Sequence, residues 1–155
     1  MTSLVKSIDQ IIEGRSLLKH PFYQMWSDGK LQLDSLKGYS KEYYQLVKQV
    51  PQFMEPLVQG ATSDMKDELI QNMKEESDHI PLWEKFAGSM GISDSELQGY
   101  DGLEKTKRAV FNLGLLMDSL DNGACAMYAF EKEIPKVSKT KLEGLKEFYG
   151  IDTKD

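Results

Sequence analysis

Apolar residues recur along most of the chain at the three- and four-residue spacing that is typical of amphipathic helices. One such stripe runs from Leu36 to Val50, and another begins after Thr62-Ser63-Asp64, a tripeptide typical of a helix start. Further stripes occupy residues 4–18, 82–90 and 142–149. No stretch of the sequence alternates between apolar and polar residues as a half-buried β-strand would. The pattern predicts an all-α bundle of about six helices.

Prolines and one strongly apolar segment refine this prediction. Residues 110–120 are apolar almost all round, which predicts a central helix packed on several sides. Pro51 and Pro56 are expected to kink or end the helix before them, because proline lacks a backbone donor. Pro81 disfavours helical geometry at the residue before it, so a helix break near Ser77 competes with a continuous helix in this region.

The length of 155 residues and the composition indicate a globular protein with one domain, residues 1–155. Acidic residues outnumber basic ones by 25 to 19, and the net charge of −6 argues against binding to nucleic acid or to an anionic membrane. No apolar run approaches the roughly 20 residues that span a bilayer, and the first residues lack the apolar core of a signal peptide. Cys125 is the single cysteine, which excludes an internal disulfide. We therefore expect a cytoplasmic protein.

Glu76 and His79 are the first candidates for chemistry. Residues three apart on a helix share a face, and di-iron and di-manganese carboxylate bundles use this Glu-x-x-His spacing. The pair falls on an apolar stripe, where a carboxylate and an imidazole are costly to bury unless they are paired or bind something. The alternative is a solvated glutamate beside a histidine that caps a helix.

Four further residues stand in apolar surroundings and are candidates for a site or its walls. Glu131 directly follows the apolar stretch 124–130, so it is either a buried carboxylate that needs a partner or the point where the helix reaches the surface. Tyr23 and Trp26 are expected in the core or in a pocket wall. Cys125 is most simply a small buried hydrophobic residue, and a catalytic role would need a neighbour that stabilises the thiolate.

Four segments carry a more specific signal when they are taken in order along the chain. They are His20-Pro21-Phe22-Tyr23-Gln24-Met25-Trp26, the pair Tyr43-Tyr44, the motif Glu75-Glu76-x-x-His79-x-x-Leu82-Trp83, and Ala126-Met127-Tyr128-Ala129-Phe130-Glu131. Together they resemble the haem-oxygenase-like superfamily, in particular its TenA/Thi-4/PqqC-like group. Within that group the chain is most similar to the haem-oxygenase-like di-iron oxidases and oxygenases.

This resemblance implies a helical enzyme that binds two irons and activates dioxygen on a small molecule in cofactor biosynthesis. Glu76 and His79 would be metal ligands from one helix, and Glu131 a carboxylate ligand from another. Glu75 would replace Glu76 if the helix is offset by one residue. Iron is the expected metal, and manganese accepts the same types of ligand.

Two departures from the family pattern change what is expected. The family normally adds a helix with further histidine and aspartate ligands, whereas this sequence stops at Asp155. The bundle is therefore expected to be short at its C-terminus and the metal site to be incomplete. Phe130 stands where relatives often place a tyrosine beside the glutamate, which leaves Tyr23 and Tyr128 as candidates for a catalytic phenol.

Two other functions are alternatives to the oxidase. A metal-independent TenA-like hydrolase of thiamine-related compounds would use Cys125 as its nucleophile. A bundle without the last helix could instead be a non-catalytic protein that binds a small molecule or a partner. Such a bundle would have an uncovered apolar face, which favours a homodimer.

Overall fold

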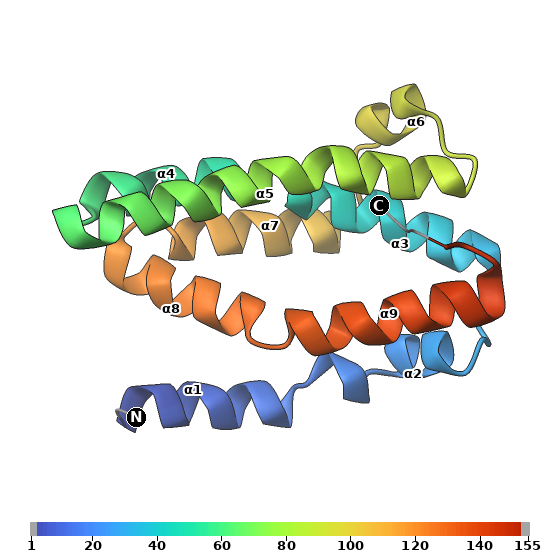
Figure 1. The fold of residues 1–155 in the computed structure, drawn as a ribbon, viewed down its shortest axis with the longest axis horizontal. Helices are drawn as coiled ribbons and strands as arrows, with labels where there is room; N and C mark the ends of the chain where they lie inside the picture. Colours follow the sequence, from blue (N-terminus) through green and yellow to red (C-terminus); the bar gives the residue numbers. More distant parts are fainter. Residues whose placement is uncertain (1–2, 153–155) are drawn as a thin grey trace. The chain divides into compact units, whose positions relative to one another are not determined.

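The structure is a computed structural model that describes residues 3–152 (Figure 1). The chain divides into two compact units. Unit 1 combines the described residues up to Gln32 with those from Met127 onward, and unit 2 is Leu33–Ala126. The single domain expected from the sequence stays a prediction.

Helices make up all the regular secondary structure of residues 3–152, so the all-α class is confirmed. Unit 1 contains α1 (Ser3–Gly14), the short 3₁₀-helix η1 (Leu17–Lys19), α2 (Pro21–Ser27) and α9 (Ile134–Tyr149). Unit 2 contains α3 (Leu33–Val47), α4 (Val50–Gly60), α5 (Ser63–Ser89), α6 (Asp94–Gly99) and α7 (Glu104–Leu116). Helix α8 (Leu120–Glu131) begins in unit 2 and ends in unit 1. None of these helices is long and apolar enough to cross a membrane.

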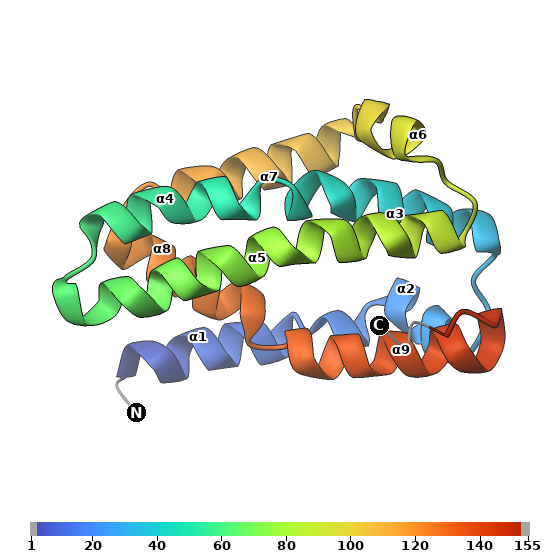
Figure 2. The same ribbon diagram turned by 45° about the horizontal axis from the view of Figure 1, so that its top comes forward.

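In unit 2, helix α5 lies alongside α3 and α4, and α7 packs against α3 (Figure 2). Their apolar stripes meet in a cluster of buried residues, with two partly buried residues packed against it. The buried members are Tyr44, Ala87, Ile92 and Leu97, and the two that pack against them are Ile80 and Trp83. Burial of this apolar surface holds α5 to α3.

Prolines mark both a helix start and a helix interior in unit 2. Pro51 lies in the first turn of α4, where its missing N–H leaves no helical hydrogen bond unmade, so the stripe that ends at Val50 divides into α3 and α4. Pro81 lies inside α5, which continues for 27 residues without the break near Ser77. Because α5 packs against α4 and α3, these contacts outweigh the backbone hydrogen bond that Pro81 cannot make.

The prediction that residues 110–120 form a central helix packed on several sides is wrong. Helix α7 contains no buried residue, and the side chains of Phe111 and Leu115 are 64% and 59% exposed. Its packed side contains Gly114, where a Cβ would lie 2.8 Å from the ring of Phe53 on α4. An apolar surface on all sides of a helix does not determine which side meets a partner within the fold.

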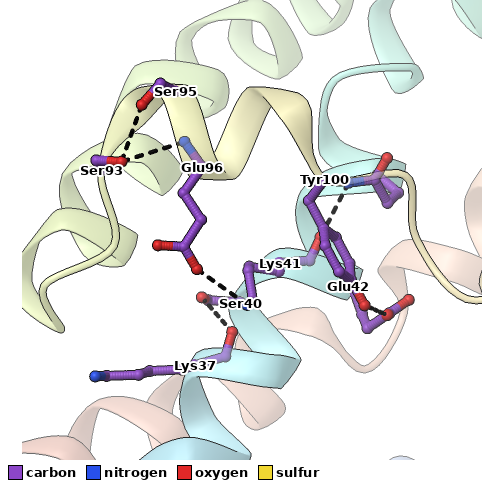
Figure 3. Close-up of polar contacts among 9 residues, drawn as sticks. Lys37, Ser40, Lys41, Glu42, Ser93, Ser95, Glu96 and Tyr100 are labelled. Atoms are coloured by element: carbon purple, nitrogen blue, oxygen red, sulfur yellow. Dashed lines mark hydrogen bonds and ion pairs between the residues drawn. The ribbon is translucent and has the colours of Figure 1, made fainter.

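A polar cluster joins α3 to α6 and to the start of α7 (Figure 3). The Glu42 carboxylate accepts hydrogen bonds from the Tyr100 hydroxyl and from the backbone N–H of Leu103, the N-cap of α7. Lys41 pairs with Glu96 of α6 at 3.1 Å. Burial acts to raise the pKa of Glu42, but the hydrogen bonds that it accepts hold this pKa below its usual value. The carboxylate therefore stays charged at the positive end of the α7 dipole.

In unit 1, α2 packs closely against α9 through a glycine. A Cβ on Gly144 would lie only 2.7 Å from Cδ1 of Trp26. Trp26 is 1% exposed, and its Nε1–H donates to the carbonyl of Lys141 at 3.2 Å. The backbone N–H of Leu31 donates to the Tyr149 hydroxyl at 3.1 Å. These contacts fix α9 to the segment that contains α2.

Candidate functional site

Glu76 and His79 are in contact on α5. His79 Nδ1 lies 3.2 Å from Glu76 Oε2, because the unbroken helix places residues three apart on one face. The Glu76 side chain is 16% exposed and the His79 side chain is 55% exposed. The structure therefore differs from the alternative of a solvated glutamate beside a capping histidine. Glu76 is mostly covered, and His79 reaches solvent and pairs with it inside a continuous helix.

This contact restricts the chemistry of the imidazole. A carboxylate beside one ring nitrogen fixes the orientation of the ring. Glu75, the other glutamate considered as a ligand, accepts a hydrogen bond from the Gln71 side chain at 2.9 Å. Of the two neighbouring glutamates, Glu76 is therefore the one that lies beside His79.

Aromatic residues anchor the part of α5 that carries the pair. Trp83, one turn beyond His79, donates from Nε1 to the carbonyl of Ser40 on α3 at 2.8 Å. The Trp83 ring stacks on that of Tyr43, with centroids 4.7 Å apart. The tryptophan therefore fixes the rotation of α5 about its axis, and with it the direction of the face that carries Glu76 and His79.

The donors near this pair are too few for a complete metal site. No group of three or more His, Cys, Asp or Glu side chains in residues 3–152 could hold a metal ion. His20, the other histidine of the chain, is the N-cap of α2, where its Nδ1 accepts a hydrogen bond from the Phe22 N–H at 3.2 Å. Glu76 and His79 thus provide only two side chains that could serve as ligands of a metal ion.

Glu131 is the last residue of α8 and belongs to unit 1. Glu131 is exposed, so it marks the point where the helix reaches the surface and is not a buried carboxylate. A carboxylate in water carries no desolvation cost, so the argument from burial does not mark Glu131 as functional. Its role as a metal ligand stays a prediction.

The two candidate catalytic tyrosines have different surroundings in unit 1. Tyr23 is 9% exposed on α2, and its ring stacks on that of Trp26 with centroids 6.5 Å apart. Tyr128 donates its hydroxyl hydrogen to Asp9 Oδ1 at 2.7 Å and accepts from Lys132 Nζ at 2.9 Å. The second network ties α1 to α8 and gives the Tyr128 proton a carboxylate that can receive it.

Lys141 is a candidate that the sequence interpretation missed. Burial lowers the pKa of its amine from 10.5 to about 8, so a fraction of the amine is neutral and nucleophilic near pH 7. Lysine usually lies at the surface, so the residue type alone does not predict a buried amine. The helical spacing contained the signal, because Lys141 stands four residues after Val137 and four before Leu145, which are both buried on α9.

A family model described as the TENA/THI-4/PQQC family matches residues 5–145. The chain belongs to this family. The resemblance read from its motifs is thereby confirmed, and the all-α structure is the helical bundle expected of a TENA/THI-4/PQQC protein. The matched residues include both Glu76 and His79 on α5 and Glu131 at the end of α8.

Several curated relatives of this TENA/THI-4/PQQC protein carry the name 4-aminobenzoate synthase. The one from Chlamydia pneumoniae is 34% identical over 161 residues, which cover 99% of this chain and 72% of the relative. The one from Chlamydia muridarum is 34% identical over 96% of this chain and 66% of its own length. A third, from Nitrosomonas europaea, is 29% identical over 97% of this chain and 68% of its length. The chain thus spans about two thirds of the length of these relatives.

Proposed function

We propose that this protein is a metal-dependent oxidase or oxygenase that activates dioxygen on a small molecule in cofactor biosynthesis. Its product would be 4-aminobenzoate. The observation that carries the proposal is the similarity to 4-aminobenzoate synthases over 96–99% of the chain. The contact between Glu76 and His79 supports it, since the chain presents a carboxylate and an imidazole together on one helix face.

Glu76 and His79 would be metal ligands, and Glu131 a further carboxylate ligand. Carboxylate and imidazole donors suit iron or manganese. A bound iron would supply the electrons that reduce dioxygen. The donors in the described residues do not amount to the two-iron set that the family resemblance implies, so the site would be incomplete within this part of the chain.

Tyr23, Tyr128 and Lys141 would act on the organic substrate. The buried Tyr23 phenol and the Tyr128 phenol, which is hydrogen-bonded to Asp9, are the proposed catalytic tyrosines. The lowered pKa of Lys141 would leave part of its amine free to accept a proton or to attack a carbonyl carbon near neutral pH.

A homodimer in the cytoplasm is the assembly that we propose for this enzyme. The exposed apolar side chains of Phe111 and Leu115 on α7 support it, because large apolar surfaces of stable proteins are usually covered by a partner. The same side chains favour the second candidate function, a non-catalytic bundle that binds a partner. Light scattering of the purified protein would distinguish a monomer from a dimer.

Growth of a bacterium that cannot make 4-aminobenzoate tests the proposed function. Expression of this chain should restore growth without added 4-aminobenzoate, and purified protein supplied with ferrous iron should consume dioxygen. Glu76→Gln and His79→Gln should abolish both effects, whereas the matched Glu75→Gln should leave them unchanged. A soluble, folded chain that restores no growth and consumes no dioxygen would contradict the proposal.

A further inference from the structure

We infer that the exposed face of α7 packs antiparallel against the same face of a second copy of this chain. The inference rests on the homodimer named in the proposed function, and it does not depend on the metal site or on the reaction. It specifies the interface of that homodimer, its symmetry and the side chains that face each other.

The centre of this face is apolar and lies away from the packed side of α7. On the packed side α7 contacts α3, and Gly114 approaches the ring of Phe53 on α4. Phe111, Leu115 and Leu116 are all exposed on the other side. Residues four apart on a helix are neighbours, so Phe111 and Leu115 form one continuous apolar surface. Such a contiguous exposed surface is typical of an interaction site.

Charges of opposite sign lie beyond the two ends of this apolar surface. Lys105 and Arg108 are exposed near the start of α7. Asp118, in the turn directly after α7, and Asp121, in the first turn of α8, are exposed at the other end. Arg108 and Asp118 each stand three residues outside the apolar pair, a spacing that keeps them on its side of the helix.

The acidic residues at the start of α7 are paired within the chain. Lys107 Nζ lies 2.9 Å from the Asp101 carboxylate and 2.6 Å from that of Glu104. Lys105 and Arg108 therefore give this end of the helix an excess of positive charge, whereas the opposite end is acidic.

A two-fold axis beside Leu113 would match every one of these positions with a complementary one. In an antiparallel pair, residues at equal distances on either side of the axis face each other, and each contact occurs twice. The facing pairs are Phe111 with Leu115, Arg108 with Asp118, and Lys105 with Asp121. A parallel pair would place the two basic ends together, so the charges select the antiparallel arrangement.

The size of the interface predicts a weak dimer. Helix α7 has 13 residues and is therefore about 20 Å long. Two such helices bury less than the roughly 1,200 Å² of a stable, specific interface. We therefore expect a dimer in exchange with the monomer, with a dissociation constant of about 1 μM or higher.

Reversal of the paired charges tests the interface, with the dissociation constant measured by sedimentation equilibrium. Arg108→Asp and Asp118→Arg should each weaken the dimer by about tenfold or more, because each places like charges opposite each other. The double variant, Arg108→Asp with Asp118→Arg, should bind within about threefold of the unchanged chain, because the attraction is restored. Lys66→Asp, a reversal at an exposed position of α5, is the matched control and should have little effect. Circular dichroism should confirm that all four variants fold.

Cross-linking with engineered cysteines tests the position of the axis. In a Cys125→Ser background, Asn112→Cys lies beside the axis and should form a disulfide between two copies under mild oxidation. Lys105→Cys is the matched control, because its two copies would lie about 24 Å apart along the helices. That distance is too long for a disulfide, which needs Cα atoms within about 7 Å.

Each negative result has a separate meaning. A chain that is monomeric at every concentration would overturn the inference together with the proposed homodimer. A dimer that is unaffected by both charge reversals, or that cross-links through Lys105→Cys and not through Asn112→Cys, would overturn the inference and leave the homodimer intact. A chain that dimerises through α7 but restores no growth and consumes no dioxygen would support the inference and contradict the proposed oxidase.

Discussion

The Tyr44 hydroxyl donates to Glu84 Oε1 at 2.7 Å, which links α3 to α5 beside the buried cluster of unit 2. Tyr44 itself is 4% exposed. Burial first, and then the hydrogen bond to Glu84, raise the pKa of this phenol to about 12. The protonated phenol is thus part of the folded core.

Tyr44→Phe should lower the free energy of unfolding by about 1–2 kcal/mol at pH 7, because Glu84 loses its hydrogen-bond donor. The folded pKa is raised above the unfolded value of 10.0, so the stabilisation from Tyr44 is complete below pH 10 and is lost as the pH rises toward 12. Urea denaturation at several pH values would measure both effects. An unfolding free energy that falls equally steeply above pH 10 in the variant would contradict this prediction.

Glu42→Ala should loosen the first turn of α7. The variant removes the acceptor for the Leu103 N–H and for the Tyr100 hydroxyl, at a cost of about 1–2 kcal/mol (Figure 3). Amide hydrogen exchange should accelerate at the start of α7. Glu96→Ala is the control, because its exposed ion pair with Lys41 should contribute less than about 1 kcal/mol.

The charge of Glu42 also predicts how this contribution depends on pH. Its pKa is lower in the folded protein than its ordinary value of 4.5, so the stabilisation is present above that value and is lost as the pH falls below it. The difference in stability between Glu42→Ala and the unchanged protein should therefore shrink in acid. A difference that stays constant from pH 7 down to the acid transition would contradict this account.

Gly144→Ala should separate α9 from α2. The added Cβ would lie 2.7 Å from the Trp26 ring and 3.2 Å from its backbone carbonyl oxygen, so the helices must shift at a cost of about 1–3 kcal/mol. Tryptophan fluorescence during urea unfolding would report both the shift and the stability. Gly38→Ala on α3 is the matched control, since nothing lies within 4 Å of its Cβ position and the better helix former should stabilise by about 0.5–1 kcal/mol.

Lys141→Met should stabilise the protein at pH 7 by on the order of 1–3 kcal/mol, because the folded state disfavours the charged amine. The folded pKa of about 8 lies below the unfolded 10.5, so the unfolded chain binds more protons between these values and the stability of the unchanged protein rises with pH there. The advantage of the variant should therefore vanish above pH 10.5. Lys139→Met, at a side chain 77% exposed, should change little at any pH.

Cys125→Ser separates the oxidase from the alternative hydrolase. Cys125 is a partly buried residue on α8 and the sole thiol of the chain. If the proposed oxidase is correct, the serine variant should restore growth of the 4-aminobenzoate-requiring strain as well as the unchanged chain does. Loss of activity in a folded Cys125→Ser variant, together with hydrolysis of a thiamine-related pyrimidine by the unchanged protein, would favour the hydrolase.

The sequence predicted the helices well where the helical signal was local. Helix α5 begins at Ser63, within the tripeptide Thr62-Ser63-Asp64 that predicted a helix start. Helix α9 ends at Tyr149, the last residue of the predicted stripe, and Gly150 follows with a left-handed backbone. Residues near Pro81 could not show whether the helix breaks near Ser77 or continues. The outcome depends on whether packing against α3 and α4 outweighs the cost of one missing hydrogen bond.

The sequence predicted burial less well than helicity. Met65 and Leu82 lie on the apolar stripes that predicted helices, yet they are 39% and 46% exposed. Phe111 on α7 is 64% exposed, although its segment was interpreted as central. An apolar side chain is buried only where another element covers it, and a one-dimensional pattern does not contain that information.

Some features of the candidate site also follow from local sequence, whereas others depend on tertiary packing. Spacing alone put Glu76 and His79 on one helix face, since a helix has a fixed 3.6-residue turn. Ordered motifs alone identified the family that the match over residues 5–145 confirms. Both are properties of neighbours along the chain, and the sequence determines them.

Tertiary structure decided what surrounds those residues. The Trp83 bond to Ser40 sets the face that α5 presents, and burial on α9 lowers the pKa of Lys141. Desolvation and long-range hydrogen bonds depend on groups far apart in the sequence, so their energies exist only once the helices have packed. The sequence by itself thus determined the helical class, the family and the contact between Glu76 and His79, whereas packing decided which side chains are exposed and which are charged.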